Sequence, residues 1–346
     1  MKNRKIIFVL INLLLLMSCR QDPSSTNNSN MTTIITVAPG HFHAALVQKY
    51  MYPQIDSQFF VFAPEGPELQ NYLARIESYN SRTENPTSWN ANIYTGKDFF
   101  QKMLDQKPGN LVTLAGNNRN KTEYIFKCIT NGLNVLSDKP MAIDTSDFSL
   151  LKEAFSLAEK NGVLLYDIMT ERFEITTIMQ KAFSQQEKIF GNLRNGSIKD
   201  PAITKESVHH FKKTISGIPL RRPPWFFDVE QEGEAIADVG THLVDLIQWE
   251  AFPEETIDYK KDIEILNASR WATKLTLKQF KSITGIENYP PYLEKYVEND
   301  FLKVIANSSV DYKLKGVFAH ISVEWKYEAP EDVGDTHFSI MRGTLS

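Results

Sequence analysis

The sequence has too little cysteine to build a disulfide framework. Only two cysteines occur in 346 residues, Cys19 and Cys128. Cys19 ends an apolar N-terminal segment, and Cys128 falls within an expected helix at 122–130. A lone cysteine on a helix behaves as a small apolar side chain. We therefore expect a mature fold without disulfides and place Cys128 in its core.

The sequence also lacks a large excess of charge of either sign. Lysine and arginine number 38 against 42 aspartates and glutamates, which gives a formal net charge of −4. The two signs are mixed along the chain, so the sequence has no basic stripe that would bind a polyanion. This excludes nucleic acid as an expected partner. A length of 346 residues favours two domains of about 150 residues each.

The apolar run at the N-terminus is too short for a comfortable membrane span. Ile6 to Met17 follows a basic start and falls short of the about 20 residues that a spanning helix needs. We therefore predict a secretion signal over residues 1–18 and a flexible tether, rich in Ser, Asn and Thr, over residues 19–32.

The end of this signal resembles the bacterial lipoprotein box. Leu16-Met17-Ser18-Cys19 implies that Cys19 is lipidated and becomes the new N-terminus. A signal peptide with an incidental cysteine is the alternative. The prediction is an exported protein, lipid-anchored to a bacterial membrane on its periplasmic or outer-membrane face. Only the anchor would touch the membrane.

Glycine is sparse where a dinucleotide-binding turn needs it. From Thr33 onward, strand-like and helix-like segments alternate, which predicts an α/β domain with a doubly wound parallel sheet of the Rossmann type over residues 33–168. Against the Gly-x-Gly-x-x-Gly fingerprint the first turn retains only Gly40, with Ala38 first and His43 third. A helix is expected to follow over residues 44–52. Alone, this turn indicates a dinucleotide only weakly.

An acidic residue follows at the spacing of a ribose-binding carboxylate. Glu65 lies 25 residues after Gly40, at the end of the expected second strand. A carboxylate there can accept hydrogen bonds from the ribose hydroxyls. A solvated loop carboxylate is an equally open alternative. The expected cofactor is NAD or NADP, held tightly because free nicotinamide nucleotide is scarce outside the cytoplasm.

The pair His41 and His43 also raises the idea of a metal site. A His-x-His pair after a first strand occurs in metal-dependent hydrolases built on barrels, where imidazoles bind zinc. That fold needs eight strand–helix units, and the segment after Gly196 does not alternate in this way. We therefore expect no metal and place both histidines along or beneath the cofactor turn.

Three side chains have the chemistry to move a proton on and off a hydroxyl group. Lys139 follows an expected strand, and Asp238 and His242 lie four residues apart at the start of an expected helix. Oxidising an alcohol requires a base within hydrogen-bond reach of its hydroxyl. His242 is the expected base, while Lys139, its pKa lowered by partial burial, would stabilise the developing alkoxide. A helix N-cap for Asp238 and a surface salt bridge for Lys139 are the structural alternatives.

Two motifs, in this order, resemble those of a known family. The segment from Asn134 to Pro140 is similar to its strand ending in Glu-Lys-Pro, with Asp138 in place of Glu, and Gly233 to Asp245 is similar to its Asp-x-Gly-x-His-x-x-Asp motif. From about Thr33 onward the chain thus resembles the glucose–fructose oxidoreductase, inositol dehydrogenase and rhizopine-catabolism (Gfo/Idh/MocA) family. Its Gly-His-Phe-His turn resembles a lipoprotein-type branch of these oxidoreductases.

The resemblance implies roles for individual residues. Lys139, Asp238 and His242 would be catalytic, and Asn117 or Asn118 would lie near the nicotinamide. The expected cofactor-binding residues are Gly40, His41, Phe42, His43, Glu65, Asn117, Asn118, Asp138 and Lys139.

The second half, residues 169–346, is expected to be an α+β domain with a large open sheet. Strand-like segments occur at 207–211, 263–269 and 316–327. In the resembling family this sheet forms the substrate wall and often an oligomer interface, which implies a homo-oligomer. The chain stops at a residue where family members continue, so we expect it to be truncated at its C-terminus. The expected substrate contacts are Arg172, His210, Trp225, Asp238 and His242, with at most one of His209 and His210 facing the site because side chains alternate along a strand.

Together these features predict an exported NAD(P)-dependent oxidoreductase that acts on a hydroxyl of a sugar, glycoside or polyol. Two alternatives remain open at this point. One is NAD-dependent glycoside cleavage by oxidation and elimination, without net redox change. The other is a carbohydrate-binding lipoprotein without catalysis.

Overall fold

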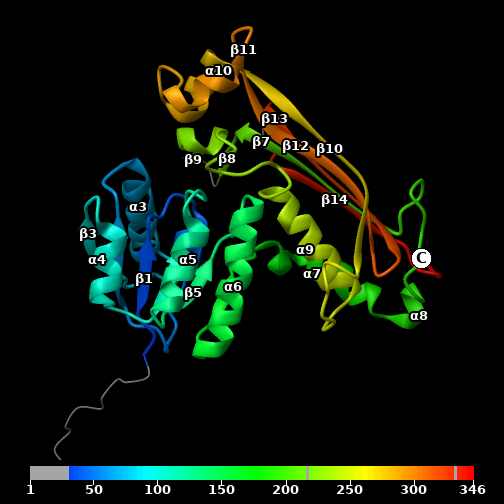
Figure 1. Ribbon diagram of the computed structural model, residues 1–346, viewed down its shortest axis with the longest axis horizontal. Coiled ribbons are helices and arrows are strands. Elements are labelled where there is room, and N and C mark those ends of the chain that lie inside the picture. Colours follow the sequence, from blue (N-terminus) through cyan, green and yellow to red (C-terminus); the bar gives the residue numbers. More distant parts are fainter. Residues whose placement is uncertain (1–30, 216–217, 331–332) are drawn as a thin grey trace, which may run out of the picture.

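The computed structural model describes residues 31–215, 218–330 and 333–346 (Figure 1). The expected signal peptide, Cys19 and nearly all of the expected tether lie outside these ranges. Within these ranges, no helix combines the length and apolar character needed to cross a membrane. The chain forms two large sheets, one after the other along the sequence.

The first sheet is parallel and has the order β3-β2-β1-β4-β5-β6. This order reverses direction between β1 and β4, as in dinucleotide-binding folds, and confirms the predicted doubly wound sheet. Helices link successive strands around the sheet (Figure 1). The strands are β1 Ile34–Val37, β2 Gln58–Ala63, β3 Asn90–Thr95, β4 Leu111–Leu114, β5 Asn134–Ser137 and β6 Leu165–Asp167; the helices are α2 His43–Leu46, α3 Pro67–Ser81, α4 Phe99–Gln106, α5 Lys121–Thr130 and α6 Thr145–Asn161.

Burial and capping explain why these segments adopt their structures. All four residues of β1 are buried, as expected for a central strand with helices on both faces. The N-cap of α6 is Asp144, whose carboxylate accepts a hydrogen bond from the amide of Asp147 at 2.8 Å, and the helix ends at Gly162 in the left-handed region (φ 66°). Cys128 is fully buried in this core, as predicted.

The second sheet has the order β10-β12-β13-β7-β14 and mixes both pairings. β13 and β7 are parallel, and the other neighbouring strands are antiparallel. Helix α9 lies between this sheet and the first half of the chain (Figure 1) and shares its apolar core. This confirms the predicted α+β second part. The strands are β7 Ile203–Lys212, β8 Thr214–Ile215, β9 Ile218–Pro219, β10 Ile263–Thr276, β11 Val297–Glu298, β12 Phe301–Leu314, β13 Val317–Glu328 and β14 Thr336–Met341; the helices are α7 Ile175–Ser184, α8 Glu187–Phe190, α9 Val239–Ala251 and α10 Leu277–Thr284, with 3-10 turns η1 Glu171–Phe173, η2 Pro224–Phe227 and η3 Pro291–Tyr296.

The helix after the first turn is shorter than expected. Instead of residues 44–52, α2 covers only four residues, His43–Leu46. Just beyond it, the main-chain carbonyl of Gln48 accepts a hydrogen bond from Trp89 Nε1 at 2.7 Å, and its side chain accepts one from the Tyr72 hydroxyl. These buried contacts with distant residues draw the chain out of the helix. The long strand β12 has no counterpart among the predicted segments.

The turns after β1 and β4 touch at Gly116. A Cβ atom at this position would overlap the carbonyl oxygen of Ala38 and lie 2.9 Å from the amide nitrogen of Gly40. Neither backbone atom can rotate away. We predict that Gly116→Ala lowers the free energy of unfolding by about 1–3 kcal/mol, the usual cost of overpacking. Chemical denaturation followed by circular dichroism measures this change.

The matched control is Gly334→Ala, because no atom lies within 4 Å of a Cβ added there. It should unfold like the unaltered protein. Equal stability of the two variants would contradict the predicted clash at Gly116.

Candidate active site

The predicted catalytic residues gather at the carboxyl ends of β1, β4 and β5. The sheet order reverses between β1 and β4, and ligands of doubly wound folds bind in the crevice at that point. The three strands lead directly into residues 38–43, 115–118 and 138–140. The start of α9, from the second half of the chain, meets this edge and supplies Asp238 and His242.

Asp138 is held between the two histidines of the first turn. Its carboxylate is hydrogen-bonded to Nδ1 of His41 at 2.8 Å and to Nδ1 of His43 at 2.7 Å. Burial acts to raise the pKa of Asp138, but the charges and hydrogen bonds of the two histidines outweigh it and hold this pKa well below its usual value. Burial and the charge of His43 lower the pKa of His41 to about 4, so this imidazole is neutral at pH 7. Because Asp138 and His43 are only 2% and 4% exposed, they form the floor of the site.

The same three residues are a candidate metal-ligand set. One ligand atom from each lies within 4.8 Å of the others. The Nδ1 atoms of His41 and His43, however, are hydrogen-bonded to the carboxylate of Asp138, and two ammonium groups lie nearby. Lys121 Nζ donates to the main-chain oxygen of Asp138 at 3.2 Å, and the charge of Lys139 contributes to the lowered pKa of His41. Positive charges this close oppose a divalent cation, so the geometry favours the hydrogen-bonded arrangement. The absence of a metal stays a prediction.

The ammonium group of Lys139 forms an ion pair with the carboxylate of Asp238. The pair joins the end of β5 to the start of α9, with only 9% and 10% of the two side chains exposed. Asp238 occupies the N-cap position of α9 but makes no capping hydrogen bond through its side chain. The structure therefore excludes both structural alternatives, a helix cap and a surface salt bridge.

The pair fixes the protonation state of both partners. Burial acts to lower the pKa of Lys139, but the charges of Asp238, Asp138 and Glu232 outweigh it and raise this pKa. The expected lowering of the Lys139 pKa is therefore wrong, because neighbouring carboxylates outweigh desolvation. Burial likewise acts to raise the pKa of Asp238, and the ion pair with Lys139 instead lowers it to about 2.

His242 lies in the first turn of α9, next to this pair. The residue is 7% exposed, and its Nδ1 atom is buried without a hydrogen-bond partner. Burial and the charge of Lys139 hold the pKa of His242 well below its usual value. The imidazole is therefore neutral at pH 7 and has one ring nitrogen free to accept a proton.

Two charged residues of the site carried no recognisable signal in the sequence. Lys121 is 2% exposed at the start of α5, and burial lowers its pKa. Glu232 lies in the loop before α9, where Asn118 Nδ2 donates to its main-chain oxygen at 2.8 Å and to its Oε2 at 3.2 Å. Burial and the charge of Asp238 raise the pKa of Glu232 well above its usual value. The pKa values of Glu232 and Asp238 are thus shifted in opposite directions, an arrangement that separates acid and base roles.

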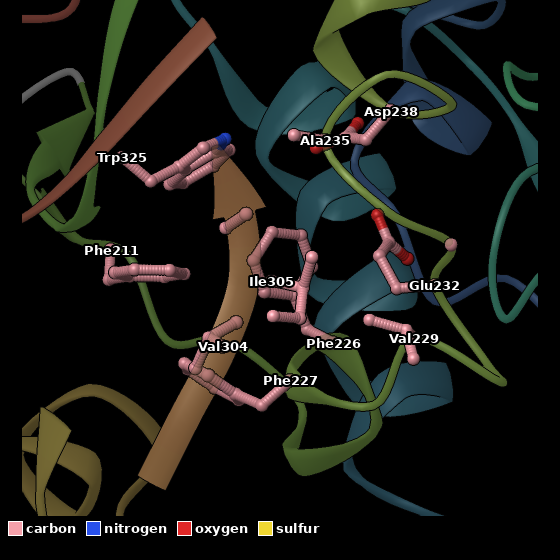
Figure 2. A pocket seen from close by; sticks show the side chains of 12 residues that line it. Phe211, Phe226, Phe227, Val229, Glu232, Ala235, Asp238, Val304, Ile305 and Trp325 are labelled. Carbon is pink, nitrogen blue, oxygen red and sulfur yellow. The ribbon is translucent and has the colours of Figure 1, made fainter. Parts of the chain in front are cut away.

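Glu232 and Asp238 line a small cavity whose remaining wall is largely apolar. Figure 2 shows the two carboxyl-bearing side chains on one side and Trp325 and Phe211 on the other, with Ile305 between them. The cavity lies between the loop before α9 and the second sheet.

Two predicted substrate residues already have partners in the protein. Arg172 forms a bidentate pair with Asp245, in which Nε donates to Oδ2 at 2.7 Å. Trp225 lies over the first turn, where a Cβ on Gly40 would come within 3.0 Å of its ring, and its Nε1 donates to Glu68 at 3.3 Å. Trp225 is thus placed at the cofactor turn. Substrate contacts of Arg172 and Trp225 stay predictions.

His209 and His210 both reach one carboxylate, that of Asp335. The distance from Nδ1 to the nearer carboxylate oxygen is 3.0 Å for His209 and 3.3 Å for His210. The amide of His210 also donates to Asp335 at 3.1 Å. This ties the ring of His210, which is 4% exposed, to the sheet. Its role in substrate binding stays a prediction.

Several features of the crevice fit a dinucleotide. The side chain of Glu65 is exposed just beyond β2, as a ribose-binding carboxylate would be. Gly40 leaves free the space that a Cβ would fill between Trp225 and Gly116. The Oδ1 atom of Asn118, after β4, is buried without a partner. These residues could hold the two ends and the middle of an extended nucleotide.

The phosphate turn itself departs from the usual pattern. The amides of Gly40 and His41 donate to the carbonyl of Ala115 at 2.9 and 3.1 Å, so neither is free for a phosphate. The helix that follows is only one turn long. Phe42 precedes this helix and packs on His41, with ring centroids 4.4 Å apart. Phosphate contacts must therefore come from groups other than these two amides.

Comparisons with known proteins agree with this architecture. Residues 179–346 match the family model described as "Putative oxidoreductase C terminal domain". A "putative oxidoreductase from Parabacteroides merdae" has a similar structure, with a TM-score of 0.88 at 53% sequence identity, covering 91% of this chain and 72% of that one. A search of the curated proteins finds no match.

Two more distant structures share the fold. GenD2 from gentamicin A biosynthesis, solved in complex with NAD, has a TM-score of 0.59 at 15% identity and covers 94% of this chain and 73% of its own. Levoglucosan dehydrogenase, solved in complex with NADH and L-sorbose, has a TM-score of 0.57 at 14% identity, with coverage of 90% and 71%.

The buried ion pair makes stability depend on pH. The pKa of Asp238 is lowered to about 2 in the folded chain, against about 3.9 when unfolded. Its stabilisation is therefore present at neutral pH and lost as the pH falls from about 4 to about 2. We predict that Asp238→Asn lowers the free energy of unfolding by about 3 kcal/mol at pH 7, and that this difference narrows over the same acidic range in urea denaturation.

Glu264→Gln is the matched control, because it removes a carboxylate from an exposed pair with Lys313 at 2.8 Å. Its effect should stay below about 1 kcal/mol. An Asp238→Asn variant as stable as the control at pH 7 would show that the pair is not stabilising.

Proposed function

Because this chain belongs to the glucose–fructose oxidoreductase, inositol dehydrogenase and rhizopine-catabolism (Gfo/Idh/MocA) family of oxidoreductases, we propose that it is an NAD-dependent dehydrogenase of a sugar, glycoside or polyol hydroxyl. The observation that carries this proposal is the buried pair of Lys139 and Asp238, with the neutral imidazole of His242 beside it, at the edge where the sheet order reverses. The NAD in GenD2 and the NADH and L-sorbose in levoglucosan dehydrogenase support the cofactor and the substrate class.

Two of the residues that would hold the cofactor follow strand ends, Glu65 after β2 and Asn118 after β4. Glu65 can accept hydrogen bonds from both ribose hydroxyls, which favours NAD because a 2′-phosphate would meet a like charge. Asn118 presents a buried carbonyl oxygen without a partner, suited to a carboxamide N–H. When bound, the nicotinamide accepts a hydride from the substrate carbon.

Each catalytic residue has a distinct task in this proposal. His242 accepts the proton of the substrate hydroxyl, because its imidazole is neutral and one ring nitrogen is unpartnered. Lys139 remains an ammonium group, since its pKa is raised, and stabilises the developing negative charge on the substrate oxygen. Asp238 holds the ammonium in place and balances its charge.

The proposal includes export and assembly. The basic start, the apolar run and Cys19 support an exported protein with a lipid anchor. The edge strand β10 has mostly exposed residues, among them Ile265 and Trp271, which are 59% and 42% exposed. Exposed apolar side chains on a sheet support a homo-oligomer that covers them.

Glu232 favours one second candidate, glycoside cleavage by oxidation and elimination. Once a ring hydroxyl is a ketone, the adjacent C–H bond is acidic; a base takes that proton, the bond to the aglycone breaks, and an acid protonates the leaving oxygen. Glu232 can supply that acid, because burial and the charge of Asp238 raise its pKa well above the usual value. Released aglycone without accumulated NADH would identify this reaction on aryl glycosides.

Loss of the proposed base should slow turnover strongly while leaving the cofactor bound. We predict that His242→Ala lowers kcat/KM by about 10²- to 10⁴-fold, measured as NADH formation with the best substrate from a panel of hexoses, glycosides and polyols. His320→Ala is the control, since that histidine pairs with Asp311 on the second sheet, at 2.6 Å, and should keep full activity.

Three results would count against this function. Full activity of His242→Ala would show that His242 is not the catalytic base. A protein without affinity for NAD(H) or NADP(H) would exclude the proposed dehydrogenase function. Sugar binding that survives both His242→Ala and Lys139→Ala, with no turnover by the unaltered protein, would indicate a binding protein.

Cofactor affinity should depend on the open space at Gly40. A Cβ there would lie 3.0 Å from the ring of Trp225 and 3.3 Å from Cα of Gly116, so a branched side chain fills the gap. We predict that Gly40→Val weakens NADH binding at least about 100-fold, which corresponds to roughly 2.7 kcal/mol, in a fluorescence titration. Gly334→Val is the control and should bind NADH normally. Unchanged affinity of Gly40→Val would place the nucleotide elsewhere.

A further inference from the structure

His209 is a second histidine of this region that the proposed chemistry leaves unused. It lies on β7, and its Nδ1 atom is 3.0 Å from Oδ2 of Asp335. Its other ring nitrogen, Nε2, is buried and has no hydrogen-bond partner. A buried polar atom without a partner costs about 1–3 kcal/mol, and native structures hold few of them. A buried ring nitrogen without a partner therefore calls for an explanation, such as a ligand that bonds to it.

The surroundings of His209 fix which ring nitrogen is free. Burial acts to raise the pKa of Asp335, but hydrogen bonds and charges from His209 and Lys213 outweigh it and hold this pKa well below its usual value. Asp335 is therefore an ionised acceptor. Burial lowers the pKa of His209, so its ring is neutral. A neutral imidazole that donates its Nδ1 proton to a carboxylate must present Nε2 as an acceptor.

The ring of His209 packs against a residue that lines the cavity. It stacks on Trp325, with ring centroids 5.0 Å apart and planes inclined by 31°. Trp325 and Asp238 line the same cavity (Figure 2). The negative charge of Asp238 also acts on the pKa of His209. The second sheet thus brings an imidazole acceptor to the region where α9 presents Asp238 and His242.

We propose that His209, oriented by Asp335, binds the substrate directly, and that its Nε2 accepts a hydrogen bond from a hydroxyl next to the one that is oxidised. The substrate then carries two neighbouring hydroxyls, one at His242 and Lys139 and one at His209. This inference rests on the proposed function and narrows its substrate class to vicinal diols. A site built to bond a hydroxyl rejects analogues that lack it, because its polar atom is left unpaired.

The test uses the full chain with ¹⁵N-labelled histidine and NADH present. D-glucose, methyl α-D-glucopyranoside and myo-inositol are titrated while the ¹⁵N NMR signals of the ring nitrogens of His209 and His242 are followed. Each signal is assigned by its absence from the spectrum of the variant that lacks that histidine. A diol that moves the His242 signals should also move Nε2 of His209. For that diol, His209→Phe should raise the dissociation constant about tenfold. A deoxy analogue, which lacks the neighbouring hydroxyl, should bind the unaltered protein about tenfold more weakly than the diol does. His209→Phe should bind the deoxy analogue and the diol with equal affinity.

The control is His320→Phe, which removes another histidine paired with a carboxylate on the same sheet. It should bind every probe like the unaltered protein. If His209→Phe folds poorly, deoxy analogues of the diol, which lack the neighbouring hydroxyl, still test the proposal on the unaltered protein.

Two outcomes would overturn the inference. A sugar that moves His242 but not His209, or deoxy probes that bind as well as the diol, would leave the dehydrogenase standing and remove His209 from its site. A panel that moves neither histidine would remove both the proposed function and the inference resting on it.

Discussion

The site depends on one ion pair between the two halves of the chain. Lys139 comes from the end of β5 and Asp238 from the start of α9, so neither half contains the site by itself. Two buried charges are tolerated only when they are paired, which requires the two halves to be docked. Side-chain hydrogen bonds from Asn117 and Asn118 cross the same boundary at 2.8 Å. The chemistry is therefore set by how the two halves meet.

Around this pair, burial and charge give each group a different protonation state. Lys139 stays positive because carboxylates surround it, whereas His242 stays neutral because it is buried next to that positive charge. Asp238 is ionised, and Glu232, near the same negative charge, is pushed toward its acid form. Burial, together with the charge of Lys139 at His242 and that of Asp238 at Glu232, thus separates a proton acceptor from a proton donor within a single crevice.

The sequence predicted what short windows encode. The alternation of strands and helices, Lys139 at a strand end, and the spacing of Asp238 and His242 are all local. The remainder depends on contacts between distant segments. The pKa of Lys139 is raised by carboxylates such as Glu232, from another part of the chain, and the helix after the first turn ends where Gln48 is held by distant aromatic side chains. The periodicity of apolar residues in the sequence does not predict these contacts between distant residues.

Trp225 belongs to the second half of the chain, yet its ring lies over Gly40 of the first half and its indole nitrogen donates to Glu68. On the proposed function, a nucleotide seated on that turn would be enclosed by both halves and would leave only after the indole moved aside. Its residence time is then governed by a conformational step, separately from its equilibrium affinity. In the exported protein that we propose, a slow exit of this kind would let one cofactor molecule serve many successive turnovers.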